Sequence, residues 1–285
     1  MFLKNKIKDT RLFNKIKEQE IYWRLKEKFF NDVPAHIYLT LKCNLSCPYC
    51  VNQANPKESK IGKYNFSPGE KWIKAINNMN KTIVFTGGEP TLHPDFIKIV
   101  NGIKKELSII VYTNFCWSEQ FTEDLLSQLK RPIKVLGSYH PSCGRPEKIL
   151  EVIKKLRKKG LFDGMIHAVG TKSQKGFLEK QVRPVFKRDG FFLTIDKDQF
   201  EFFNKEACCM KFRKTVHCSG KGIIIAPDGK RYQCVSKMLR MKDPLEDVFT
   251  ENLRKDEIHS ICPDYGFCSP CDMGFKRIPI SSQIF

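Results

Sequence analysis

Three cysteines stand close together near the start of the chain, in the segment Cys43-Asn44-Leu45-Ser46-Cys47-Pro48-Tyr49-Cys50. Thiolates at this spacing can bind one metal centre, but three of them do not complete a shell of four ligands. A structural zinc site is normally closed by four protein ligands, whereas a cubane [4Fe-4S] cluster can take three cysteines and leave one iron open. The spacing therefore favours a cluster with an exchangeable ligand over part of a zinc site or three ordinary thiols.

A second motif, Gly87-Gly88-Glu89-Pro90, follows the apolar run Ile83-Val84-Phe85. Glycines allow a close approach of the backbone to a ligand, and a glutamate carboxylate can accept hydrogen bonds from an ammonium group. With the spacing Cys-x3-Cys-x2-Cys and an aromatic residue before the last cysteine, the sequence resembles the radical SAM superfamily. The resemblance extends over about residues 35–200.

The resemblance implies a cofactor and a reaction. In this family the amine and carboxylate of S-adenosylmethionine chelate the open iron of a [4Fe-4S] cluster, and an electron from the cluster breaks the sulfonium bond to give a 5′-deoxyadenosyl radical. Cys43, Cys47 and Cys50 are then implied to hold the cluster. The residues expected to bind S-adenosylmethionine come from the motifs and from the ends of predicted strands; they are Tyr49, Gly87, Gly88, Glu89, Thr113, Asn114 and Ser138.

Apolar runs alternate with helical patterns along the stretch that carries these motifs. Strands are predicted at residues 35–41, 81–86, 108–113, 133–139, 163–169 and 191–195. Helices are predicted at residues 67–79, 95–106, 119–129, 146–159 and 176–187. This alternation indicates βαβ units and a parallel sheet. Because six units are too few for a closed eight-stranded barrel, the predicted fold is α/β, with a partial (β/α)6 TIM-type barrel and a small C-terminal cysteine-rich domain for an auxiliary cluster.

Local signals predict several helix ends. Ser67, with Pro68 and Glu70 after it, predicts a capping box at the start of the first helix of the barrel. Gly160 is expected to end the fourth of these helices. Pro184 is expected to weaken or kink the fifth. His140, which precedes a proline after the fourth strand, is interpreted as a structural loop histidine rather than a ligand or acid.

The last third of the chain carries a second set of cysteines. The spacing Cys218-x10-Gly229-x4-Cys234 resembles the opening half of the SPASM and Twitch extensions, in which a hairpin carries two ligands of an auxiliary [4Fe-4S] cluster. Residues 222–234 predict such a hairpin, with a Pro-Asp-Gly turn. Cys268 and Cys271 resemble the closing pair of ligands.

Four thiolates would make a closed site that fits iron-sulfur or zinc equally on ligand type, and the resemblance favours iron-sulfur. The pattern of a SPASM domain with two auxiliary clusters is not matched, so one auxiliary cluster is expected. Cys262 competes for a place in it and is expected to be the spare, while Cys208 and Cys209 are unassigned.

The predicted domain organisation follows from these patterns. Residues 1–34 form an N-terminal helical segment, with an amphipathic helix expected at 11–30. Residues 35–200 form the partial barrel, and residues 201–285 form the auxiliary-cluster domain.

Composition limits the compartment and the partners. No signal peptide and no apolar run of membrane-helix length is present, so the 12 cysteines are interpreted as cluster ligands and free thiols of a cytoplasmic protein without a membrane partner. The formal net charge is +19, which can steer a protein towards nucleic acid. No RNP-like or zinc-finger motif accompanies this charge, and nucleic acid is therefore a secondary alternative.

The leading functional interpretation is an enzyme that abstracts hydrogen from an unreactive carbon of a peptide or a small metabolite. The auxiliary cluster would bind substrate or take an electron, and a flavodoxin or ferredoxin would supply the electron for the first cluster. Two alternatives are a radical enzyme that modifies RNA and a non-catalytic iron-sulfur protein. The residues do not name the substrate.

Overall fold

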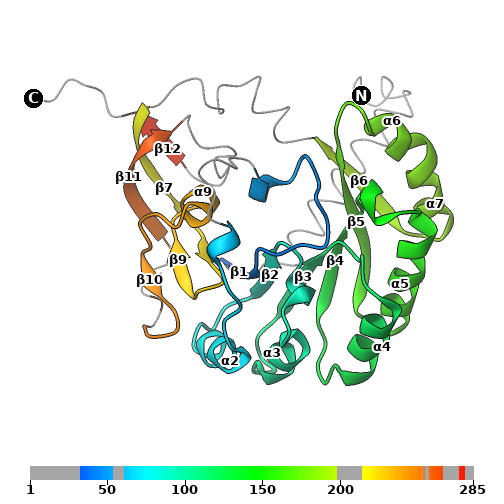
Figure 1. Cartoon of the computed structure of the whole chain (residues 1–285), viewed down its shortest axis with the longest axis horizontal. Coiled ribbons are helices and arrows are strands. Elements are labelled where there is room, and N and C mark those ends of the chain that lie inside the picture. The colour runs from blue at the N-terminus through cyan, green and yellow to red at the C-terminus, as the bar shows by residue number, and fades with distance from the viewer. Residues whose placement is uncertain are drawn as a thin grey trace, which may run out of the picture.

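The structure is a computed structural model that describes residues 33–53, 61–197, 214–251, 253, 257–265 and 276–279 (Figure 1). Some of the predictions above concern other parts of the chain. Those that lie outside the described residues are the helix at 11–30, Cys208, Cys209, Cys268 and Cys271.

A sheet of nine strands organises the described chain, in the order β10-β9-β8-β1-β2-β3-β4-β5-β6. The last six strands in this order follow one another in the sequence and pair in parallel. They are β1 (Ala35–Thr40), β2 (Ile83–Gly87), β3 (Ile109–Thr113), β4 (Lys134–Ser138), β5 (Phe162–Gly170) and β6 (Phe192–Lys197). The prediction of an α/β fold with six parallel strands is therefore confirmed.

Helices line the outer side of this curved sheet (Figure 1). Their apolar faces and the strands form one core, in which Trp72, Ile153 and Phe186 are fully buried. Burial of a large apolar side chain stabilises the fold by about 1.5–3 kcal/mol. The helices are α2 (Gly69–Asn77), α3 (Phe96–Gly102), α4 (Glu119–Gln128), α5 (Pro146–Lys158), α6 (Lys175–Phe177) and α7 (Arg183–Arg188).

The start of α2 differs from its prediction. The helix begins at Gly69, and no side chain at its N-cap position makes a capping hydrogen bond, so the predicted capping box is wrong. The Gly69 amide instead donates to Asp95 Oδ2 at 2.9 Å, from the segment that leads into α3. A carboxylate from a neighbouring βα unit thus satisfies a free amide at this helix N-terminus.

The effects predicted for Gly160 and Pro184 on their helices are both observed. Gly160 follows α5 with φ of +70°, a conformation that glycine adopts without steric cost. The helix expected to be weakened at Pro184 is broken into α6, a π-helical segment (Leu178–Val182) and α7, which has the proline in its first turn. No helix in the described part of the chain is long and apolar enough to cross a membrane.

The predicted hairpin is formed by β8 (Ile223–Ile225) and β9 (Lys230–Tyr232), with Gly229 at a φ of +82° in the turn. It does not stand apart from the parallel sheet, because β8 pairs in parallel with β1 and β10 (Glu246–Asp247) continues the same sheet. The main sheet thus extends well past residue 200. The domain boundary expected there stays a prediction.

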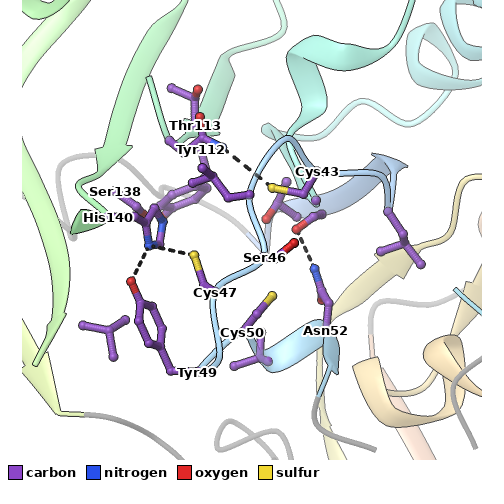
Figure 2. Close-up of a pocket in the computed structure, with 18 residues that line it drawn as sticks. Cys43, Ser46, Cys47, Tyr49, Cys50, Asn52, Tyr112, Thr113, Ser138 and His140 are labelled. Carbon is purple, nitrogen blue, oxygen red and sulfur yellow. Dashed lines mark hydrogen bonds between the residues drawn. The ribbon is translucent and has the colours of Figure 1, made fainter. Parts of the chain in front are cut away.

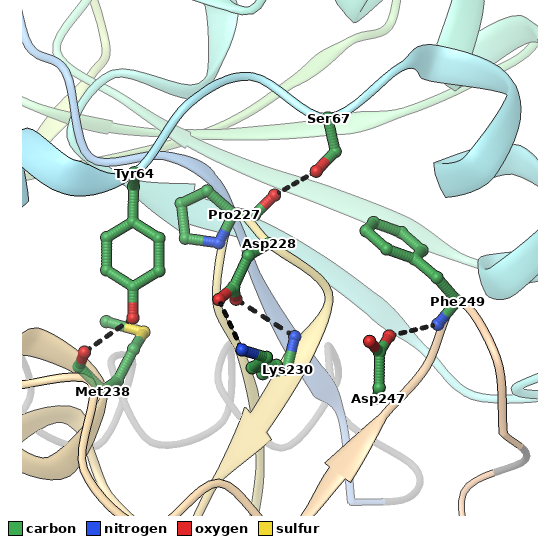
Figure 3. A network of polar contacts seen from close by, with 8 residues as sticks. All are labelled: Tyr64, Ser67, Pro227, Asp228, Lys230, Met238, Asp247 and Phe249. Atoms are coloured by element: carbon green, nitrogen blue, oxygen red, sulfur yellow. Dashed lines mark hydrogen bonds and ion pairs between the residues drawn. The ribbon is translucent and has the colours of Figure 1, made fainter.

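Two hydrogen bonds fasten the segment that precedes α2 to the hairpin and to the helix that follows it (Figure 3). The buried Tyr64 hydroxyl donates to the Met238 carbonyl at 2.8 Å, in α9 (Val235–Leu239). The Ser67 hydroxyl donates to the Pro227 carbonyl at 2.7 Å, in the turn between β8 and β9. The chain that leaves the cysteine loop is therefore held against the last third of the protein.

A second, antiparallel sheet has the order β11-β7-β12. Its strands are β7 (Lys214–Lys221), β11 (Glu257–Tyr265) and β12 (Lys276–Pro279). Asp264 of β11 is buried and pairs with Arg240 at 3.2 Å and with Lys242 at 3.6 Å, both just after α9. These ion pairs link the second sheet to the hairpin extension, which comprises β8, β9, α9 and β10 at residues 223–247.

Removal of one partner of a buried ion pair should destabilise the extension. Arg231 of β9 is 2% exposed in its side chain, and its Nη1 lies 3.2 Å from Glu246 Oε2 in β10. We expect Glu246→Ala to lower the free energy of unfolding by about 3 kcal/mol, because it leaves a buried guanidinium without its carboxylate. Urea denaturation measures the change. The matched control is Glu70→Ala at the exposed pair with Lys98, which should change stability little; equal losses in the two variants would contradict this role.

Candidate active site

The three clustered cysteines border one cavity of about 490 Å³ at the carboxyl ends of the parallel strands (Figure 2). Most residues that the motifs and strand ends singled out line the same cavity. These are Cys43, Cys47, Tyr49, Cys50, Gly87, Gly88, Thr113, Asn114 and Ser138. The fold thus brings together segments from the ends of β1, β2, β3 and β4, as expected for a site in a parallel barrel.

The two glycines at the end of β2 let the cysteine loop pack against it. The Gly88 amide donates to the Thr40 carbonyl at 3.0 Å, and the Glu89 amide donates to the Lys42 carbonyl at 2.9 Å. A Cβ on Gly87 would lie 2.4 Å from the Thr40 oxygen, and a Cβ on Gly88 would lie 2.1 Å from the Lys42 oxygen. The structure therefore provides a packing reason for both glycines, and their contact with a methionine group stays a prediction.

Glu89 ties the end of β2 to the end of β3. Its carboxylate is 1% exposed and accepts from the Thr91 amide and hydroxyl at 3.3 and 2.6 Å, and from the Thr113 hydroxyl at 2.9 Å. Its other oxygen accepts from the Asn114 amide at 2.9 Å. Burial raises the pKa of this carboxyl, and the four hydrogen bonds act in the opposite direction. Among the described residues Glu89 does not border the cavity, and its contact with an ammonium group stays a prediction.

Cys43 is positioned from the β3 side. The Asn114 side-chain amide donates to Asn44 Oδ1 at 2.8 Å and lies 3.7 Å from the Cys43 sulfur. The Asn44 amide in turn donates to the Cys116 carbonyl at 2.7 Å. Burial is the main cause that raises the pKa of the Cys43 thiol. A bound metal centre would overcome this cost, because metal binding releases the thiol proton.

Cys47 is positioned from the β4 side. His140 Nδ1 lies 3.5 Å from its sulfur, and Ser142 Oγ lies 3.9 Å from it. The same nitrogen is 3.0 Å from the Tyr49 hydroxyl, and the two rings stack with centroids 5.8 Å apart. Burial lowers the pKa of His140 to about 4. These contacts place the His140 ring beside Cys47 and Tyr49, and its interpretation as a structural loop residue stays a prediction.

Three thiolates that border one cavity fit a cubane [4Fe-4S] cluster, which can take three cysteines and leave one iron open. No three metal-ligating side chains in the described part of the chain converge on one point. In a cubane each cysteine binds a different iron, so the sulfurs need only surround one cavity. Asn52 also borders the cavity, and its buried Oδ1 has no hydrogen-bond partner among the residues that the structure describes. A buried acceptor of this kind is available to a ligand that carries donor groups.

Comparison with known proteins agrees with this geometry. The sequence profile of the Radical SAM superfamily matches residues 37–174. Residues 37–174 therefore form a radical SAM domain. A GTP 3′,8-cyclase of Listeria welshimeri is 30% identical over 175 residues, which cover 53% of this chain and 49% of the relative. The chain therefore spans about half the length of the curated relatives it matches.

Two solved structures share the radical SAM fold. Native anSMEcpe with bound AdoMet superposes with a TM-score of 0.53 at 15% identity, over 78% of this chain and 79% of that one. The same protein with bound AdoMet and Cp18Cys peptide gives a TM-score of 0.51 at 15% identity, over 77% and 78%. The α/β fold with its parallel sheet is thus confirmed. The radical SAM domain implies a [4Fe-4S] cluster and S-adenosylmethionine.

The structure describes three of the five cysteines expected near an auxiliary cluster. Cys218 of β7 is buried and pairs across the sheet with Ser260 of β11. Cys262, two residues further along β11, packs against Cys218. Cys234 directly precedes α9. The auxiliary ligand set stays a prediction, and the contact with Cys218 makes Cys262 the clear competitor for a place in it.

Substitution of Gly88 should displace the cysteine loop. We expect Gly88→Ala to lower the iron content of anaerobically reconstituted protein, because its Cβ would collide with the Lys42 carbonyl. The iron bound per chain and the absorbance of the cluster measure the effect. Gly176→Ala is the matched control, since its Cβ would meet nothing within 4 Å. A Gly88→Ala protein with full iron would show that the loop does not depend on this contact.

Proposed function

We propose that this protein reductively cleaves S-adenosylmethionine at a [4Fe-4S] cluster held by Cys43, Cys47 and Cys50. The 5′-deoxyadenosyl radical then abstracts hydrogen from a peptide or small-metabolite substrate. The observation that carries the proposal is the position of the three cysteines around one cavity with the ends of β2, β3 and β4. The intact motifs and this shared cavity favour an enzyme over a non-catalytic iron-sulfur protein.

In this proposal the residues of the chain bind and orient S-adenosylmethionine and shield the site from water. When bound, the cluster supplies the electron that breaks the sulfonium bond. Ser138 presents a hydroxyl group at the end of β4, where it can bind a polar group of S-adenosylmethionine. The Thr113 hydroxyl at the end of β3 donates to Glu89, so it can only accept a hydrogen bond from S-adenosylmethionine. The Tyr49 ring offers an apolar surface at the rim for the adenine. Leu41 and Val169 border the same cavity and limit the access of water to the radical.

Both substrate classes have support from related proteins. The solved structure with a bound peptide supports a peptide substrate through its fold. The GTP 3′,8-cyclase supports a small molecule through sequence similarity over half of its length. We propose a flavodoxin or ferredoxin as the electron donor and the reducing cytoplasm as the compartment.

We further propose an auxiliary [4Fe-4S] cluster bound by Cys218, Cys234, Cys268 and Cys271. The positions of Cys218 in β7 and of Cys234 directly after β9 support this proposal, because these two strands flank β8 in the sequence. Such a cluster would tie the second sheet to the extension and would bind substrate or take an electron.

The first cluster can be tested by its iron content and its product. We expect anaerobically reconstituted protein to hold about eight irons, and the variant with Cys43, Cys47 and Cys50 all changed to Ala to hold about four. Because the lost cluster is the one that supplies the electron, this variant should form no 5′-deoxyadenosine from S-adenosylmethionine and a reductant. Chromatography of the product and iron analysis measure both. Wild-type protein that forms no 5′-deoxyadenosine would reject the proposed enzyme, and saturation at four irons would reject the auxiliary cluster.

The auxiliary ligands can be tested with two single substitutions. We expect Cys271→Ala to lose the second cluster, because Cys268 and Cys271 have the spacing that lets two thiolates of one turn reach one cluster. Cys262→Ala should keep it, and serves as the matched control. Iron content and electron paramagnetic resonance of the reduced protein measure the outcome. A Cys262→Ala protein without the second cluster would show that its contact with Cys218 is a shared ligand site.

A further inference from the structure

The loop after β4 approaches one cysteine of the triad with two polar side chains. His140 precedes the short 3₁₀ helix Pro141–Cys143, and Ser142 lies within it. His140 Nδ1 is 3.5 Å from the Cys47 sulfur, and Ser142 Oγ is 3.9 Å from it. Cys47 is only 7% exposed, so its contact with His140 is largely shielded from water, whereas Ser142 itself is exposed. Hydrogen bonds in such surroundings are electrostatically stronger than in water.

The chemistry of a bound thiolate decides which ring nitrogen carries the proton. A cysteine that ligates iron has lost its proton, and its sulfur can only accept hydrogen bonds. A bare lone pair on His140 Nδ1 would face this negative sulfur and repel it. A proton on Nδ1 makes the same contact a hydrogen bond, in the neutral ring and in the charged ring alike. The Tyr49 hydroxyl, 3.0 Å from Nδ1, can then act as a second acceptor of that proton.

We propose that His140 donates a hydrogen bond from Nδ1 to the sulfur of Cys47 and thereby raises the reduction potential of the [4Fe-4S] cluster, with Ser142 as a weaker second donor. The inference rests on the proposed function, because it requires the cluster to be held by Cys47. Reduction adds one electron to the cluster from an external reductant, and no bond of His140 is broken. Donors to the ligand sulfurs stabilise this added negative charge, which is one way in which proteins set the potentials of iron-sulfur clusters.

His140 is therefore a positioning residue that acts through a ligand of the cluster. A residue that only filled space beside Tyr49 would leave the potential unchanged when replaced by a ring of similar shape. The substitution His140→Phe keeps an aromatic ring against Tyr49 and removes the donor. His140→Asn restores a donor at about the place of Nδ1 without an imidazole ring.

The experiment is a potentiometric titration of anaerobically reconstituted, full-length protein, followed by electron paramagnetic resonance. The signal that changes on addition of S-adenosylmethionine identifies the cluster held by Cys43, Cys47 and Cys50. We expect His140→Phe to retain its iron and to shift the midpoint of this signal to lower potential. Ser142→Ala should produce a smaller shift in the same direction, because its contact is longer. His140→Asn should recover most of the loss.

Several outcomes would overturn the inference. One is a wild-type midpoint in a His140→Phe protein with full iron, and another is a failure of His140→Asn to recover the shift. If His140→Phe loses iron, the variants Ser142→Ala and His140→Asn decide the question. The proposal is rejected if the midpoint potential of Ser142→Ala equals that of wild type and the midpoint potential of His140→Asn is lowered. The inference and the proposed function can fail separately. If the variants show these shifts but wild-type protein forms no 5′-deoxyadenosine, the proposed function is rejected and this inference stands.

Discussion

The close contact between the cysteine loop and the turn after β2 is the constraint on which the site depends. Two backbone hydrogen bonds join them, from the Gly88 and Glu89 amides to the Thr40 and Lys42 carbonyls. The contact is so close that neither Gly87 nor Gly88 leaves room for a Cβ. Because backbone groups make this contact, the cysteine loop has a defined path before any metal centre binds. Binding of a metal centre by the thiolates then costs less conformational entropy.

The ends of β3 and β4 complete the site from the other side of the cavity. Glu89 holds the amide of Asn114, and the Asn114 side chain reaches towards Cys43. His140 reaches towards Cys47 from the end of β4. Each of these two cysteines thus has a polar neighbour on a different strand end. The parallel order of β2, β3 and β4 places those strand ends at one edge of the sheet, and the site is a direct consequence of that order.

The last third of the chain adds β8, β9 and β10 to the main sheet and also forms a second sheet. Strand β8 lies beside β1, the strand that leads into the cysteine loop. The hydrogen bonds of Tyr64 and Ser67 to the hairpin extension fasten the other end of the same loop region. Both ends of the segment that carries the triad are therefore anchored in part by residues beyond 220. A structural change in the hairpin extension can therefore alter the position of the cysteine loop through these contacts.

The sequence by itself determined the six parallel strands, the broken helix at Pro184 and the membership of the three cysteines in one site. These features follow from local periodicity, from the rigid φ of proline and from a spacing of a few residues, all of which are properties of short segments. Only the tertiary structure decided that Asp95 caps α2 in place of Ser67, that β8 pairs with β1, and that His140 faces Cys47. Each of these contacts joins residues more than 20 positions apart, and their geometry depends on how whole elements pack, which no local pattern encodes.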